Sequence, residues 1–196
     1  MKAFGADKLG MTDQEIQETV DLWRSSSPKI VQMWWDIGKA AARSIVKRGH
    51  VDTAYRGVCF DYEKGVLWMT LPSGRRIAYY GARYEESRRM PGKKVITYMG
   101  VDQQTKKWTR QESYGPKLVE NLTQSAARDC LRESMLALDA AGFDIRFTVH
   151  DEVIATEPLD GRSVEDMSEI MGRPIPWAPG LPLRADGYSC PFYQKD

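Results

Sequence analysis

The sequence has few cysteines, few histidines and almost no net charge. Its 196 residues include three cysteines, two histidines and a formal net charge of +1. Cys59, Cys130 and Cys190 are far apart and odd in number, which favours reduced thiols over a disulfide framework or a zinc-binding spacing. Because the charge balance is nearly even, any binding to nucleic acid must come from local patches.

Long apolar runs are missing as well. No stretch reaches the roughly 18 apolar residues that a membrane span needs, and the first residues lack the basic-then-apolar order of a signal peptide. We therefore expect no membrane partner, no secretion and a cytoplasmic location. Hydrophobic residues make up 42% of the chain and charged residues 28%, as in ordinary globular proteins.

Two helices are expected near the N-terminus. Thr12 and Glu15 form a capping-box pattern ahead of an amphipathic helix that runs to about Ser25. Ser27 and Pro28 then begin a second helix, because proline is tolerated in a first turn. Apolar residues recur at helical spacing over about five turns of this second helix: Ile30, Val31, Met33, Trp34, Ile37, Ala41, Ile45 and Val46.

The middle of the chain has the period-two pattern of β-strands. Three short strands are expected at Val58–Tyr62, Val66–Leu71 and Arg75–Tyr80. A polar loop from 81 to 94 and a hairpin over 95–101 and 107–112 follow. Basic side chains here are candidate phosphate contacts, or alternatively a solvated basic edge that discourages aggregation: Arg75, Arg76, Lys93, Lys94, Lys106 and Lys107, with Tyr79 and Trp108 interleaved.

A long helix from about Lys117 to Ala141 has an apolar face and an adjoining polar stripe. Asn121, Gln124 and Arg128 recur at three- and four-residue spacing, which puts them on one side of the helix. The apolar face is expected to bury against a sheet. Its residues are Leu118, Leu122, Ala126, Leu131, Met135 and Leu138.

A hairpin with an acidic tip comes directly after this helix. Runs rich in β-branched and aromatic residues flank His150, Asp151 and Glu152, which places the three polar residues at the tip. Two carboxylates there suit Mg²⁺, which prefers oxygen ligands. The alternative is an ordinary solvated turn, since acids are common in turns.

The order and spacing of the long helix, the Ala140–Phe143 turn and the acidic hairpin resemble the C-terminal palm of a family A DNA polymerase, the DNA polymerase I type. The bacteriophage branch is most similar. Its members share runs resembling Leu71–Arg76, Tyr98–Gln103 and Lys117–Asn121. The resemblance extends from about residue 3 to the end of the chain.

The resemblance implies an α+β fold, a polymerase palm fragment with antiparallel β-hairpins. Residues 1–55 would form a helical segment on the fingers side, and residues 56–196 the palm segment with inserted hairpins. Ser163 would begin a capped helix that runs to about Met171. A last strand over Leu183–Tyr188 would complete the palm sheet.

The resemblance also assigns roles to the site residues. It implies template-dependent, two-metal nucleotidyl transfer in DNA replication, with Mg²⁺ as cofactor and primer-template DNA and deoxynucleoside triphosphates as partners. Asp151 matches the metal ligand, Glu152 its less strictly required neighbour, and His150 a residue near the primer terminus.

The helix stripe would contact the DNA minor groove through Gln124, Arg128 and Asn121. The family commonly has its asparagine four residues before its glutamine. Here Glu120 holds that position and Asn121 is three residues before Gln124.

Two parts of the family's catalytic centre are missing from this sequence: the strand with the other catalytic aspartate, and the fingers helix that grips the nucleotide. Lys2–Leu9 resembles the stretch just after that helix. We therefore expect a fragment, a split-gene product or a truncated chain that is inactive alone and needs a polypeptide with the missing motifs.

Two alternatives remain open. One is a non-catalytic DNA-binding or structural remnant of a polymerase gene. The other is a metal-dependent nuclease, which would be expected to contain its complete set of acids. A neighbouring reading frame with the missing motifs would separate a split enzyme from a remnant.

Overall fold

The computed structural model describes residues 10–194 and shows an α+β chain of two compact units. The first unit comprises Met1–Ala54, Phe60–Trp68 and Ala78–Val119, and the second Tyr55–Cys59, Met69–Ile77 and Glu120–Asp196. The resemblance of Lys2–Leu9 to a family motif lies outside the described residues. The domain boundary expected after residue 55 stays a prediction.

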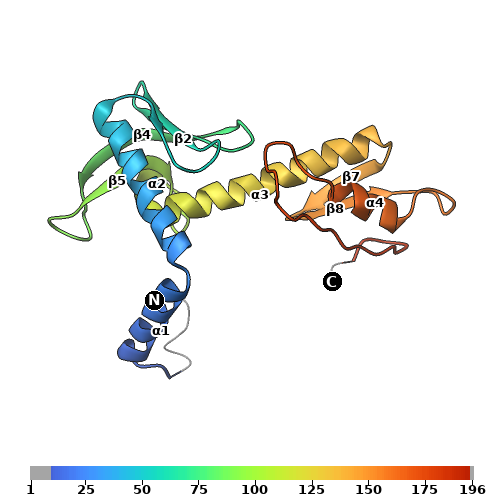
Figure 1. Ribbon diagram of the computed structural model, residues 1–196, viewed down its shortest axis with the longest axis horizontal. Helices are drawn as coiled ribbons and strands as arrows, with labels where there is room; N and C mark the ends of the chain where they lie inside the picture. Colours follow the sequence, from blue (N-terminus) through green and yellow to red (C-terminus); the bar gives the residue numbers. More distant parts are fainter. Residues whose placement is uncertain (1–9, 195–196) are drawn as a thin grey trace. The chain divides into compact units, whose positions relative to one another are not determined.

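The elements follow one another along the chain as labelled in Figure 1. Their bounds are α1 Asp13–Ser26, α2 Pro28–Lys47, β1 Val51–Asp52, β2 Cys59–Glu63, β3 Val66–Thr70, β4 Arg76–Glu86, β5 Lys94–Val101, β6 Trp108–Ser113, α3 Gly115–Ala140, β7 Asp144–Val149, β8 Glu152–Thr156 and α4 Val164–Met171. Strands β1 to β6 form one sheet in sequential order, and β7 and β8 form a second. Between residues 10 and 194 no helix is both long and apolar enough to span a bilayer.

The predicted starts of the two N-terminal helices are confirmed. The Thr12 hydroxyl accepts from the Glu15 N–H and the Glu15 carboxylate accepts from the Thr12 N–H, so the predicted capping box is present. Helix α2 begins at Pro28 as expected. Its apolar face is buried in the middle, at Ile37 for example, whereas Ile30 and Val46 near its two ends are exposed.

Helices α2 and α3 approach each other through glycine. A Cβ placed on Gly115 would lie 1.9 Å from the carbonyl oxygen of Trp34, and one on Gly38 would lie 3.2 Å from the Gly115 Cα. Such separations are possible only where neither residue has a side chain. The start of α3 is therefore fixed against α2 by backbone contact.

The large sheet differs from expectation at β4. This strand continues to Glu86, so the polar loop expected to begin at residue 81 begins instead after residue 86. Pairing with β5 extends β4 through a bulge between Tyr80 and Arg83. Tyr79 also differs, because it is buried with its ring edge-on to Tyr98 at 5.1 Å and is therefore a core residue.

The second unit packs α3, the β7–β8 hairpin and α4 around one core (Figure 1). Leu138, Phe143 and Ile170 are buried there, and Ile145 and Val153 pack against them. The expectation that α3 buries an apolar face against the hairpin is confirmed at this end of the helix.

The C-terminal elements match one expectation and contradict another. Ser163 and Asp166 cap α4 reciprocally, as predicted. The last strand predicted over Leu183–Tyr188 is wrong, since these residues have no strand conformation. A strand is held by ladder hydrogen bonds to a neighbour, and residues 183–188 pair with neither edge of the β7–β8 sheet.

Candidate functional site

The acidic hairpin closes with a two-residue turn. Val149 on β7 pairs with Glu152 on β8, which leaves only His150 and Asp151 between the strands. His150 has a φ of +53°. Tight hairpin turns require positive φ, and histidine is one of the non-glycine residues enriched in that conformation. The predicted hairpin is confirmed with His150 and Asp151 at its tip, whereas Glu152, which was also predicted there, is the first paired residue of β8.

The turn exposes the residues that the sequence singled out. His150 and Asp151 are exposed, while Glu152 at the start of β8 is half-buried. Neighbouring residues in an extended segment point to opposite sides, so the two adjacent carboxylates differ in their access to a ligand. Asp151 has the more open oxygen atoms of the two.

Polar contacts hold the two strands together at the end of the hairpin opposite the turn. The Arg146 Nε donates to the Thr156 hydroxyl at 2.9 Å, and that hydroxyl donates to the Asp144 carboxylate at 3.1 Å. Arg146 and Asp144 also form an ion pair. With the apolar packing of Ile145 and Val153, these contacts fix the strands that position the tip.

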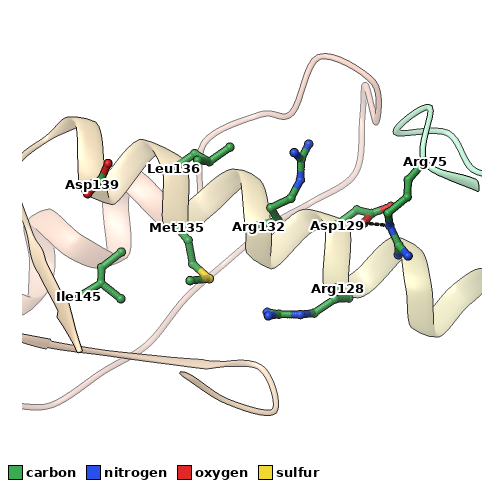
Figure 2. Close-up of a pocket in the computed structure, with 8 residues that line it drawn as sticks. All are labelled: Arg75, Arg128, Asp129, Arg132, Met135, Leu136, Asp139 and Ile145. Carbon is green, nitrogen blue, oxygen red and sulfur yellow. Dashed lines mark hydrogen bonds and ion pairs between the residues drawn. The ribbon is translucent and has the colours of Figure 1, made fainter. Parts of the chain in front are cut away.

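The polar stripe of α3 is only partly open to solvent. Gln124 and Arg128 are exposed, whereas Asn121 is half-buried. Figure 2 shows Arg128 and Met135 extending from the side of α3 on which Ile145 of β7 lies, and these residues line one hollow. Arg128 is therefore brought to the hairpin side of the helix.

An ion pair with a buried carboxylate lies next to the stripe. The Asp129 carboxylate is 3% exposed and accepts from the Arg75 Nε at 2.6 Å (Figure 2). The Ser73 hydroxyl also donates to it, and the Arg75 Nη2 donates to the Ser125 carbonyl at 3.0 Å. Arg75, a candidate phosphate contact, is thus already engaged within the protein.

Sequence reasoning missed this role of Asp129. A signal was available, because Asp129 follows Leu122 and Ala126 at helical spacing on the apolar face. A charge on such a buried face indicates a partner of opposite charge. The sequence does not show that this partner is Arg75, because the two residues are 54 positions apart.

His50, a residue without a predicted role, lies between two carboxylates of the first unit. Its Nδ1 is 2.7 Å from Asp61 Oδ1 and its Nε2 is 3.0 Å from Asp52 Oδ1. The hydrogen bond with Asp61, and then that with Asp52, raises the pKa of His50 above its usual value. Since the two aspartates lie on opposite ring nitrogens, their arrangement suits a cationic imidazolium. His50 and Asp61 also offer ligand atoms that lie, together with the Cys59 sulfur, within 4.8 Å of one another.

The chain is similar to a known bacteriophage protein. A DNA polymerase of Bacillus phage SP02 is 42% identical to the chain over 193 residues, which is 98% of this chain and 29% of the relative. The chain thus spans under a third of the relative's length. No protein-family model and no solved structure matches it.

The similarity confirms the predicted relationship to a bacteriophage DNA polymerase. The aligned stretch covers 193 of the 196 residues. The narrower assignments to family A and to the palm stay predictions, as do the roles of Asp151, Glu152, His150, Asn121, Gln124 and Arg128.

Proposed function

We propose that this chain is the C-terminal palm part of a template-dependent DNA polymerase of the family A type, where it contacts the growing primer end. The observation that carries the proposal is the 42% identity to a phage DNA polymerase across 98% of the chain. The exposed carboxylate at the turn between β7 and β8 supports it, because nucleotidyl transfer needs acids that are open to metal and substrate.

Asp151 is the proposed ligand for Mg²⁺. Carboxylate oxygens fit this hard ion, and the exposed turn leaves room for further oxygen ligands from water, phosphate or another segment. When bound, Mg²⁺ lowers the pKa of the attacking hydroxyl and stabilises charge on the transferred phosphoryl group. Glu152, half-buried at the start of β8, has the secondary role.

The α3 stripe is proposed to hold the primer-template duplex. The Gln124 amide and the Arg128 guanidinium are exposed donors, and all correct base pairs present acceptors in the minor groove. Such contacts test the geometry of the pair without reading its sequence. Asn121 is half-buried and has the smaller role, and His150 is proposed to lie near the primer terminus.

A further polypeptide segment is proposed to supply the remaining catalytic groups. Helix α1 supports this part of the proposal, because none of its residues is buried: Leu22 is 70% exposed, and Trp23 is still 45% exposed although its ring stacks on Trp34. Large apolar side chains in that state favour packing against another protein surface.

The test is a chimaera in which this chain replaces the matching segment of the Bacillus phage SP02 DNA polymerase. We expect template-dependent primer extension with Mg²⁺ and nucleotides. Asp151→Asn should lower the rate by roughly 100-fold or more, since it removes a charged metal ligand, and Glu152→Gln by less than about 10-fold. Asp160→Asn, the same change at an exposed acid of the following loop, is the matched control.

Two results would contradict the proposal. Full extension by the Asp151→Asn chimaera would remove the catalytic role of the hairpin. A folded chimaera that binds primer-template but never extends it would favour the alternative, a non-catalytic DNA-binding module.

A further inference from the structure

One face of strands β4, β5 and β6 collects exposed aromatic and basic side chains. On β4, Tyr80 pairs with Met99 of β5 and Arg83 pairs with Thr97. The two β4 residues are three positions apart in the sequence, whereas their partners on β5 are two positions apart. The bulge between them adds one residue. Tyr80 and Arg83 therefore point to the same side of the sheet, where unbroken alternation would put them on opposite sides.

Strand β6 adds to the same face. Met99 pairs with Arg110, and Val101 with Trp108, so Trp108 lies on the side that carries Tyr80. Tyr80 is 51% exposed, Val101 57% and Trp108 58%. We name Tyr80, Arg83, Val101 and Trp108 the β4–β6 face.

Arg110 fixes the shape of this face. Its Nη1 donates to the Gly81 carbonyl in the bulge at 3.0 Å and to the Thr97 hydroxyl at 2.9 Å. Thr97 in turn donates to Glu85 at 2.6 Å. Because these hydrogen bonds cross all three strands, Tyr80 and Trp108 stand on a backbone that is held in place before any ligand binds.

The surrounding charge is positive. Residues 78–113 contain eight Lys or Arg and four Asp or Glu, a surplus of four, although the whole chain has a net charge of only +1. Two of the acids, Glu85 and Glu112, share the face but accept hydrogen bonds from the Thr97 and Ser87 hydroxyls. Arg83 is 64% exposed with its Nη1 3.9 Å from the Glu85 carboxylate, and Lys106 and Lys107 are exposed at the tip of the β5–β6 hairpin. The Asp102 carboxylate of that tip accepts from the N–H groups of Gln104 and Thr105, at 3.1 and 2.7 Å, and is occupied within the turn.

We propose that the β4–β6 face binds single-stranded DNA. Unpaired bases stack on the Tyr80 and Trp108 rings, and Arg83, Lys106 and Lys107 contact the phosphates. Exposed rings favour a single strand over a duplex, where the bases already stack on one another. The choice of DNA over RNA rests on the proposed function, while the site itself lies on a different unit from the acidic hairpin.

The first test is the affinity of the full chain for a labelled oligothymidylate of about 16 nucleotides, measured by fluorescence anisotropy at low salt. Trp108→Ala and Tyr80→Ala should each weaken binding by about 5- to 100-fold, and Trp108→Phe by less. Trp35→Ala is the matched control, because Trp35 is 63% exposed but lies on α2. It should leave the affinity unchanged.

The second test addresses the lysines that face the phosphates. The double variant Lys106→Gln/Lys107→Gln should weaken binding and reduce the slope of log affinity against log salt by about 0.7 for each phosphate that is no longer neutralised. Lys29→Gln/Lys39→Gln has the same net charge and alters two exposed lysines of α2. It should change the slope little.

Three results would overturn the proposal: no binding to the oligonucleotide at low salt, equal weakening by Trp108→Ala and Trp35→Ala, or a self-associating chain whose association Trp108→Ala abolishes while DNA affinity is unchanged. The last would make the face an interface between copies of the chain. Failure here is separable from failure of the proposed function, because Asp151→Asn should stop extension by the chimaera without altering affinity for the oligonucleotide.

Discussion

At the scale of single residues, His50 is the group whose environment most directly sets a pH response. Its two ring nitrogens face the carboxylates of Asp61 and Asp52 at 2.7 and 3.0 Å. Both neighbours favour the imidazolium, so the pKa of His50 in the folded chain is raised. His50 follows α2, and its partners lie on β1 and β2. These contacts are therefore strongest when His50 is protonated.

This predicts a stability that falls as pH rises. The unfolded chain titrates His50 near the ordinary value of about 6.5, so the stabilisation is complete below that pH and is lost as pH increases through the raised folded pKa. His50→Gln should remove this dependence. Urea unfolding at several pH values measures the difference, with His150→Gln as the control that removes the only other histidine. Equal pH dependence in the wild-type chain and His50→Gln would contradict the assignment.

At the scale of elements, the glycine contact between α2 and α3 predicts a sharp difference between two substitutions. Gly115→Ala would place a Cβ 1.9 Å from the Trp34 carbonyl oxygen, and a helix backbone cannot move aside as a side chain can. We expect a loss of about 3 kcal/mol in the free energy of unfolding. Gly49→Ala meets nothing within 4 Å and should change stability by less than about 1 kcal/mol.

Urea or thermal unfolding of the two variants tests this expectation. The two variants are well matched because both changes add one methyl group to a glycine of the same unit. Similar stabilities for Gly115→Ala and Gly49→Ala would show that the two helices do not meet as closely as described.

The elements that sequence predicted well are those with local signals. The capping residues Thr12 and Ser163, and Pro28 in a first turn, fix helix starts through contacts within four residues. The extent of β4 and the failed strand over Leu183–Tyr188 depend on whether a neighbouring strand is present, which alternation alone does not reveal.

The same division applies to the candidate site. The His150 and Asp151 turn was predictable, because two β-rich runs with a short polar gap predict a hairpin. The pairing of Asp129 with Arg75 was not, since it joins residues far apart in the sequence. Long-range ion pairs depend on the folded arrangement, and a single sequence carries little information on it.

At the scale of the whole molecule, the average charge hides an uneven distribution. The surplus of four positive charges over residues 78–113 is balanced by an acidic excess elsewhere in the chain. A net charge of +1 therefore does not exclude a strong local attraction for a polyanion.

The isolated chain is predicted to bind Mg²⁺ or Mn²⁺ only weakly and not to extend a primer. Asp151 supplies one carboxylate at an open turn, whereas a hard divalent ion needs about six oxygen ligands. Isothermal titration and broadening of Asp151 NMR signals by Mn²⁺ measure the binding, with Asp151→Asn as control. Template-dependent extension by the chain alone would show that it contains a more complete catalytic centre than the hairpin provides.

The two-residue turn between β7 and β8 also limits how this stretch of sequence can change over evolution. Val149 and Glu152 pair directly, so His150 and Asp151 are the whole connection. One inserted or deleted codon would shift the strand register and turn alternate side chains to the other face. Substitutions leave the register intact. In homologous genes this segment should therefore diverge by replacement of residues while its length stays constant.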